Sequence, residues 1–208
     1  TLPPRSEAFR TVRGARLSMI FQEPMTSLSP LHKVGAQIGE VIEIHEGLHG
    51  EAVEKRVVDM LRLVRFPDPE RGFKSYPFEL SGGLRQRAMI AMALVCKPVL
   101  LIADEPTTAL DVTVQAQILA LIKDLQREMK MAVMMITHDM GVVANLAEEV
   151  VVLYRGEVME AGTAGDLFRT PRHPYLKALM AAVPKIDADP SERLQPLVLE
   201  AVDEARPK

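Results

Sequence analysis

The sequence has little of several residue types that mark specialised proteins. Its single cysteine, Cys96, cannot form an internal disulfide or supply a thiolate cluster, which suits a reducing compartment. Aromatic residues make up only 4% of the chain, and the formal net charge is −3. Because gripping a nucleic-acid backbone needs a dense basic face, this charge makes such a function a minority interpretation. With 208 residues, 48% of them hydrophobic, the chain has the composition of one soluble globular domain with a core of its own.

Long hydrophobic runs are also missing. A bilayer-spanning helix needs about 18 or more apolar residues, and the apolar runs here, such as 88–96 and 99–103, are much shorter. The opening residues Thr-Leu-Pro-Pro-Arg contain neither the apolar stretch of a signal peptide nor an initiating methionine. We therefore expect no membrane span and no signal peptide, and we expect that the sequence begins inside a longer chain.

The first half of the sequence predicts a short strand followed by helices. Residues 16–21 are typical of a buried strand that ends at Gln22-Glu23-Pro24. Apolar residues then recur three or four apart over 34–64, and the glycines at 47 and 50 divide this stretch into two helices. A turn at Gly82-Gly83 leads into a third helix over 84–96.

The second half alternates between strand and helix patterns. Apolar runs at 99–103, 132–136 and 150–154 predict buried strands, and periodic segments at 113–130 and 140–146 predict helices. This alternation indicates an α/β fold with a mainly parallel sheet and right-handed crossovers. A turn at Arg155-Gly156 predicts that the sheet ends in an antiparallel hairpin. After Pro184, acidic residues and prolines predict an exposed tail or linker.

Two acidic residues, Asp104 and Glu105, follow the buried strand at 99–103. Carboxylates at such a position are costly unless a cation or a reaction needs them there. In phosphoryl-transfer sites, one carboxylate at a strand end holds Mg²⁺ and a neighbouring one can polarise the attacking water. An isolated Asp-Glu pair more often simply caps a turn, so other residues must decide between these two interpretations.

Three further groups carry possible chemistry. Ser81-Gly82-Gly83 at a helix start exposes backbone N–H groups that can receive phosphate oxygens. His138 ends a second apolar strand, and Gln22 ends the first with a neutral amide that can contact a metal-bound water. Each alone has an ordinary structural explanation, so only their combination indicates a site.

The combination occurs in a fixed order along the chain. It runs through Phe21-Gln22-Glu23-Pro24, Leu80-Ser81-Gly82-Gly83-Leu84-Arg85-Gln86-Arg87, Val99-Leu-Leu-Ile-Ala-Asp104-Glu105-Pro106, Thr108-Ala109-Leu110-Asp111 and Ile136-Thr137-His138-Asp139. These segments resemble the Q-loop, signature, Walker B, D-loop and H-loop of the nucleotide-binding domain of ABC transporters. Segments 22–30, 106–118 and 173–179 are similar to the ATPase subunits of dipeptide, oligopeptide and nickel importers.

The resemblance implies an ATP-hydrolysing enzyme with ATP and Mg²⁺ as cofactors. Asp104 would position Mg²⁺, and Glu105 would orient or deprotonate the attacking water. His138 would contact the γ-phosphate. Gln22 would sense the nucleotide beside the metal and report to the membrane subunits.

The resemblance also implies a site shared between two domains. Ser81, Gly82 and Gly83 would bind the γ-phosphate of ATP held on the opposite subunit, and Asp111 would tune the dimer interface. The implied partners are membrane permease subunits, a second nucleotide-binding domain in a homodimer, a heterodimer or one tandem chain, and indirectly an extracytoplasmic substrate-binding protein. No nucleic acid is implied, and the location would be the cytoplasmic face of the cell membrane.

The sequence departs from the family pattern in two places. Leu84 stands where the signature usually has Gln, in the part of the motif least directly engaged. A Walker A loop needs Gly-x-x-x-x-Gly-Lys-Ser/Thr, and none of the twelve glycines is followed by lysine. Since only 21 residues precede Gln22, we expect that the chain lacks the amino-terminal part of the nucleotide-binding core. We predict that these 208 residues alone neither bind ATP tightly nor hydrolyse it.

The implied fold is a partial P-loop NTPase core with a mainly parallel sheet and an inserted helical subdomain. We expect the end of the amino-terminal core at 1–22, the helical subdomain with the signature at 23–97, the core with Walker B, D-loop and H-loop at 98–170, and a carboxy-terminal helix with a tail or linker at 171–208. Two alternatives to a peptide-importer ATPase stay open. One is a soluble ABC ATPase acting on nucleic acid or ribosomes, and the other is a non-hydrolytic remnant.

Overall fold

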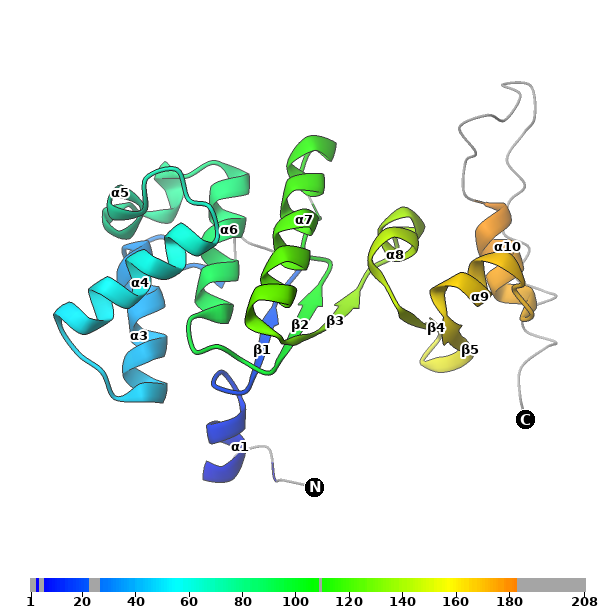
Figure 1. Ribbon diagram of the computed structural model, residues 1–208, viewed down its shortest axis with the longest axis horizontal. Coiled ribbons are helices and arrows are strands. Elements are labelled where there is room, and N and C mark those ends of the chain that lie inside the picture. Colours follow the sequence, from blue (N-terminus) through cyan, green and yellow to red (C-terminus); the bar gives the residue numbers. More distant parts are fainter. Residues whose placement is uncertain (1–2, 4–5, 23–26, 109, 183–208) are drawn as a thin grey trace. The chain divides into compact units, whose positions relative to one another are not determined.

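The computed structural model describes residue 3 and residues 6–22, 27–108 and 110–182, which form two compact units, 1–136 and 137–208 (Figure 1). Three parts of the sequence prediction lie outside the described residues. They are Glu23 and Pro24 of the Q-loop, Ala109 of the D-loop and the tail after Pro184.

The first unit is built around a parallel sheet of three strands in the order β1-β2-β3. They are β1 (Leu17–Ile20), β2 (Leu100–Asp104) and β3 (Ala132–Ile136). Ile20 pairs with Ala103, and Asp104 pairs with Ile136. The predicted strands and their parallel arrangement are confirmed, and the carboxyl ends of all three meet at one edge of the sheet.

The two faces of this sheet differ in burial. Leu101 and Ala103 of β2 have no exposed surface, whereas Met134 and Ile136 of β3 are 53% and 44% exposed. The prediction that 132–136 forms a buried strand is therefore wrong for the described residues of this unit. An apolar run shows that a strand is hydrophobic on both faces but not which segment covers each face.

Helices make up the rest of the first unit. They are α1 (Glu7–Val12), α3 (Val34–Glu46), α4 (Glu51–Leu63), α5 (Pro69–Lys74), the 3-10 turn η1 (Pro77–Glu79), α6 (Gly82–Leu94) and α7 (Val112–Met129). Gly47 ends α3 with a φ of +67°, and Gly50 precedes α4 with a φ of +63°, so both glycines occupy conformations that other residues adopt with strain. The two predicted helices within 34–64 are confirmed. The third starts at Gly82, earlier than predicted, because the Ser81 side chain caps it.

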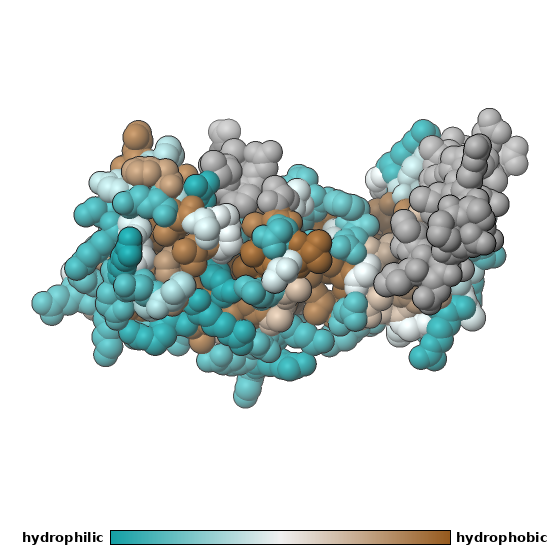
Figure 2. All heavy atoms as spheres, turned by 90° about the horizontal axis from the view of Figure 1, so that it is seen from above, coloured by the Kyte–Doolittle hydropathy of each residue, from teal (hydrophilic) through white to brown (hydrophobic). Residues whose placement is uncertain are grey.

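The core of the first unit lies among α3, α4, α6, α7 and the sheet. Its fully buried large side chains include Ile38, Ile42, Leu61, Ile90, Leu94, Leu101, Ile118, Leu121 and Leu125. Figure 2 shows hydrophilic residues over much of the visible surface, with hydrophobic residues gathered toward the middle of the view. None of the helices described is long and apolar enough to span a membrane.

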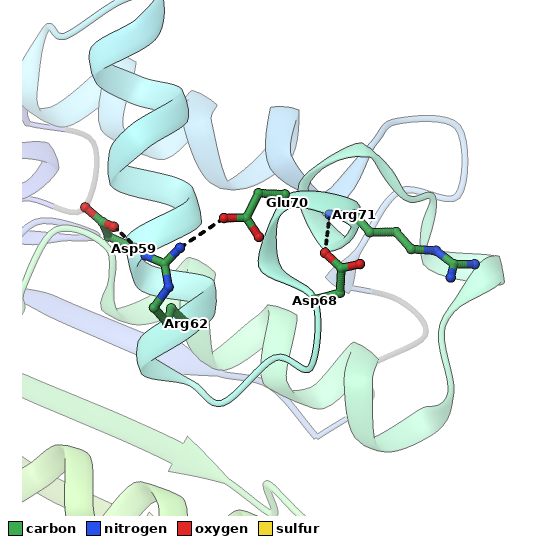
Figure 3. A network of polar contacts seen from close by, with 5 residues as sticks. All are labelled: Asp59, Arg62, Asp68, Glu70 and Arg71. Carbon is green, nitrogen blue, oxygen red and sulfur yellow. Dashed lines mark hydrogen bonds and ion pairs between the residues drawn. The ribbon is translucent and has the colours of Figure 1, made fainter.

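Polar contacts join α4 to the loop and helix that follow it (Figure 3). Arg62 forms ion pairs with Asp59 at 2.8 Å and with Glu70 at 3.0 Å. Asp68 caps α5 by accepting a hydrogen bond from the backbone N–H of Arg71. Since the paired side chains are more than half exposed, these ion pairs orient α5 but add little to stability.

The second unit contains α8 (Met140–Leu146), β4 (Glu149–Tyr154), β5 (Glu157–Thr163), α9 (Ala164–Arg169) and α10 (Pro174–Ala181). The predicted hairpin is confirmed, with Arg155 and Gly156 both at positive φ, as a tight two-residue turn requires. However, β4 and β5 form a separate two-stranded sheet, so the prediction that 150–154 continues the parallel sheet is wrong for the described residues. A short connection accounts for the pairing of β4 with β5, but the apolar pattern of 150–154 does not show which strand lies at the other edge of β4.

Candidate active site

The register of the sheet brings Gln22 and Glu105 together. Each stands two residues beyond one member of the paired residues Ile20 and Ala103, so both reach the same level at the carboxyl edge. Nε2 of Gln22 donates a hydrogen bond of 2.8 Å to Oε2 of Glu105. Two of the predicted site residues, 83 positions apart in the sequence, are thus in direct contact.

Further hydrogen bonds fix both the backbone and the carboxylate of Glu105. Its backbone N–H donates to the carbonyl of Ile136 at 2.9 Å, which joins it to the end of β3. The hydroxyl of Thr108 donates a hydrogen bond of 2.9 Å to Oε2 of Glu105, the same oxygen that accepts from Gln22. The backbone φ of Glu105 is +43°, a left-handed conformation that costs free energy for a residue other than glycine. The turn therefore fixes the direction of this carboxylate.

Asp104 is the last residue of β2 and is partly buried. No group of three or more His, Cys, Asp or Glu side chains able to hold a metal ion occurs within the described part of the chain. Mg²⁺ commonly binds through one or two carboxylates together with water and substrate phosphates, so a dedicated protein cage is not required. The predicted contacts of Asp104 and Gln22 with Mg²⁺ therefore stay a prediction.

Ser81, Gly82 and Gly83 form the start of α6. The hydroxyl of Ser81 accepts a hydrogen bond from the N–H of Leu84 at 3.4 Å, and Ser81 and Gly82 are exposed. A side chain at Gly83 would lie 2.9 Å from Cγ1 of Val114 on α7, whereas one at Gly82 would meet Leu110 at an ordinary 3.5 Å. Gly83 is therefore required for the close packing of two helices, and Gly82 leaves the helix start open to solvent.

The same helix reaches the turn that follows β2. Gln86, one turn beyond the glycines, is buried, and its side-chain amide donates a hydrogen bond to the carbonyl of Pro106. Gln86 and Thr108 lie within the predicted motifs but were not among the predicted site residues. A glutamine on a helix face that is otherwise apolar is the signal that could have identified Gln86.

Asp111 caps α7 through a hydrogen bond of 2.9 Å from the N–H of Val114 to its carboxylate. This contact gives Asp111 a structural role in addition to its predicted role at a dimer interface. His138 is exposed and belongs to the second unit, where the next residue, Asp139, caps α8. The predicted contact of His138 with a γ-phosphate stays a prediction.

Two shifted pKa values lie outside these groups. Burial, together with the nearby charge of Arg65, lowers the pKa of Arg87, whose guanidinium donates to the carbonyl of Val64 at 2.8 Å. Burial and the neighbouring carboxylate of Glu46 raise the pKa of Cys96 to about 11. Both residues therefore support the packing of α6 and its neighbours and are not reactive groups.

Sequence comparison identifies the family. Residues 5–108, half of the chain, match the family model described as ABC transporter. The chain belongs to the ABC transporter family. Residues 159–206 match a second model, described as the oligopeptide/dipeptide transporter C-terminal region. The ABC transporter family and the peptide-importer subfamily predicted from the five motifs are both confirmed.

Curated relatives have names that fit this subfamily. The chain is 59% identical over 182 residues to the glutathione import ATP-binding protein GsiA of Pectobacterium atrosepticum. These aligned residues make up 88% of this chain and 29% of the relative. It is 52% identical over 193 residues to the oligopeptide transport ATP-binding protein OppD of Bacillus subtilis. Here the aligned residues make up 93% of this chain and 54% of the relative. The chain thus spans about half or less of the length of these relatives.

Solved structures support the fold. A dimeric ATP-binding cassette in a post-hydrolysis state, bound to ADP and Pi, is 30% identical, with a TM-score of 0.65 over 76% of this chain and 67% of that chain. A dimeric bacterial ABC transporter cassette matches with the same values. The predicted α/β fold of an ABC ATPase with a parallel sheet is confirmed.

Proposed function

We propose that the complete protein is the ATP-hydrolysing subunit that energises import of peptides or related small solutes through an ABC permease. The observation that carries the proposal is the contact between Gln22 and Glu105 at the ends of adjacent parallel strands. The family match and the peptide and glutathione importers among its relatives support this choice of cargo class.

Glu105 is the residue we assign to water activation. Its carboxylate accepts hydrogen bonds from Gln22 and Thr108 through one oxygen, Oε2. An anchored carboxylate can orient a water molecule and accept its proton during attack on a γ-phosphate. Gln22, at the end of β1, would report the state of this site to the membrane subunits, because its amide contacts the catalytic carboxylate directly.

The remaining site residues would bind the nucleotide. Asp104 and Gln22 would hold Mg²⁺, which neutralises charge on the phosphates when bound. The N–H groups at Ser81, Gly82 and Gly83, at a helix start where Ser81 and Gly82 are exposed, would receive the γ-phosphate of ATP bound to a second nucleotide-binding domain. His138 would contact the γ-phosphate.

The dimeric form of the solved relatives supports a shared site, and Asp111 would lie at its interface. The partners would be permease subunits, a second nucleotide-binding domain and, indirectly, a substrate-binding protein, at the cytoplasmic face of the membrane. The division into segments 1–22, 23–97, 98–170 and 171–208 also belongs to this proposal. The match to an oligopeptide transporter region and the net charge of −3 do not favour an ATPase that acts on nucleic acid or ribosomes.

The test uses the complete subunit assembled with its permease in membrane vesicles. We expect magnesium-dependent ATP hydrolysis and ATP-driven peptide uptake. Glu105→Gln should reduce kcat by at least about 100-fold while ATP binding is retained, because a general base contributes at least that factor. A polypeptide limited to these 208 residues should show no turnover, since it has no Walker A sequence. Unchanged turnover in Glu105→Gln, or association with ribosomes instead of a permease, would contradict the proposal.

A further inference from the structure

Gln86 is the most deeply buried polar side chain described, with 1% of its surface exposed. It lies in α6 among Ala88, Met89 and Ile90, which are also buried. Its Nε2 donates to the carbonyl of Pro106, while its Oε1 is buried with no hydrogen-bond partner among the described atoms. The glutamine therefore satisfies one buried group at the expense of another.

This balance argues that Gln86 does not serve packing alone. A buried carbonyl oxygen without a donor is costly, and an apolar residue of similar volume would avoid that cost. The orientation of the amide is also defined, because rotating it by half a turn would place Oε1 against the carbonyl oxygen of Pro106. What a glutamine provides here, and an apolar residue would not, is a hydrogen bond that fixes the position of Pro106.

Pro106 belongs to the turn that positions Glu105. The N–H of Thr108 donates to the carbonyl of Glu105 at 3.1 Å, which closes a four-residue turn with Pro106 at its second position. Within this turn Glu105 has its left-handed φ, and the Thr108 hydroxyl reaches back to the carboxylate. A strained conformation persists only where its surroundings over-determine it. Gln86 supplies one of those restraints from a different helix.

We propose that Gln86 is a positioning residue for the Glu105 carboxylate, and that it acts through Pro106. The proposal rests on the proposed ATPase function of Glu105. The proposal also gives two parts of α6, the helix that begins at the signature, different roles. The exposed start of α6 would face nucleotide on the partner domain, while its buried interior holds the chain's own catalytic turn.

The proposal predicts a specific kinetic defect. Gln86→Met keeps the side-chain volume but removes both the donor to Pro106 and the unpartnered Oε1. Misplacement of a catalytic group by a fraction of an ångström lowers the rate of the chemical step without weakening substrate binding. In the complete subunit with its permease, we expect kcat to fall on the order of tenfold while KM for MgATP stays within about twofold of wild type.

A second readout separates positioning from a general defect of α6. In a Glu105→Gln background, where hydrolysis is blocked, ATP-driven closure of the two nucleotide-binding domains should be the same with Gln86 and with Gln86→Met. The matched control is Ser18→Ala, which removes a part-buried hydrogen bond from the Ser18 hydroxyl to the carbonyl of Gly14; Ser18 makes no contact with Pro106 among the described hydrogen bonds. Ser18→Ala should lower the melting temperature and leave kcat unchanged.

Each outcome decides the question. An unchanged kcat in Gln86→Met overturns the inference alone, and so does a loss of ATP-driven closure that matches the loss of kcat. Absence of turnover in the wild-type complex overturns the proposed function and this inference with it. If Gln86→Met does not fold, Gln86→Asn, which retracts the amide by one methylene, should show the same fall in kcat.

Discussion

Gln22 and Glu105 are joined by a hydrogen bond of 2.8 Å from the amide of one to the carboxylate of the other. The two residues come from strands that are consecutive in the sheet but separated in sequence by the whole helical segment. A displacement of Gln22 would therefore disturb a hydrogen bond to the carboxylate that we assign to water activation. We propose that this contact couples Gln22 to the chemical step.

Removing this amide should impair the chemical step. In the complete subunit, Gln22→Ala deletes a donor to Oε2, and we expect kcat to fall on the order of tenfold, because the carboxylate loses part of its orientation. Steady-state ATP hydrolysis measures this effect. Gln117→Ala, on the exposed face of α7, is the matched control and should behave as wild type. A Gln22→Ala variant with wild-type kcat would show that the contact has no role in turnover.

The two glycines of the signature should respond differently to alanine. Gly83→Ala places a methyl group 2.9 Å from Val114, and we expect a loss of about 1–3 kcal/mol in the free energy of unfolding from overpacking. Gly82→Ala meets only an ordinary contact and should be neutral or stabilising, since alanine favours a helix. Urea unfolding monitored by circular dichroism checks both values.

The clash at Gly83 can be tested by relieving it. In a Val114→Ala background the opposing methyl groups are gone, so Gly83→Ala should cost little or nothing. The double-mutant cycle then gives a favourable coupling of about 1 kcal/mol or more between the two substitutions. If Gly83→Ala destabilises equally in both backgrounds, the contact with α7 is not the cause.

Cys96 should titrate unusually late. Burial and Glu46 raise the pKa of its thiol from the ordinary 9.0 to about 11, against an opposing contribution from Arg56. The neutral thiol is therefore favoured in the folded state, and its contribution to stability is present below pH 9 and is lost as the pH rises toward 11. The rate of alkylation by iodoacetamide against pH should give a midpoint near 11 for the folded protein and near 9 in urea. Coincident midpoints would contradict the assignment.

Glu160 should hold the start of the last helix described. Its carboxylate accepts hydrogen bonds from the backbone N–H groups of Arg172 and His173 at 2.9–3.2 Å. Glu160→Ala removes the acceptor for both, and we expect amide hydrogen exchange at these two positions to become about tenfold faster, as the loss of about 1.4 kcal/mol implies. Glu157→Ala, at the exposed turn of the hairpin, should leave both amides protected. Unchanged exchange in Glu160→Ala would mean that other contacts hold this helix start.

Several features followed from the sequence alone. Apolar runs and glycine positions predicted the strands at β1, β2 and β3 and the division between α3 and α4, because local periodicity and turn chemistry determine where such elements begin and end. The motifs also placed Gln22 and Glu105 directly after strands. Only the strand order β1-β2-β3 of the folded sheet shows that these two strands are adjacent and that the two side chains meet.

Other features depended on the tertiary structure. No local pattern shows that Gln86 reaches Pro106 or that Gly83 packs closely against Val114, because each relationship joins surfaces of separate elements. Nor did the apolar run of β3 reveal that Met134 would be half exposed. The sequence determines which residues are able to form a strand, a cap or a catalytic pair. Packing decides which surfaces meet, because burial depends on every element that approaches a face and not on the face itself.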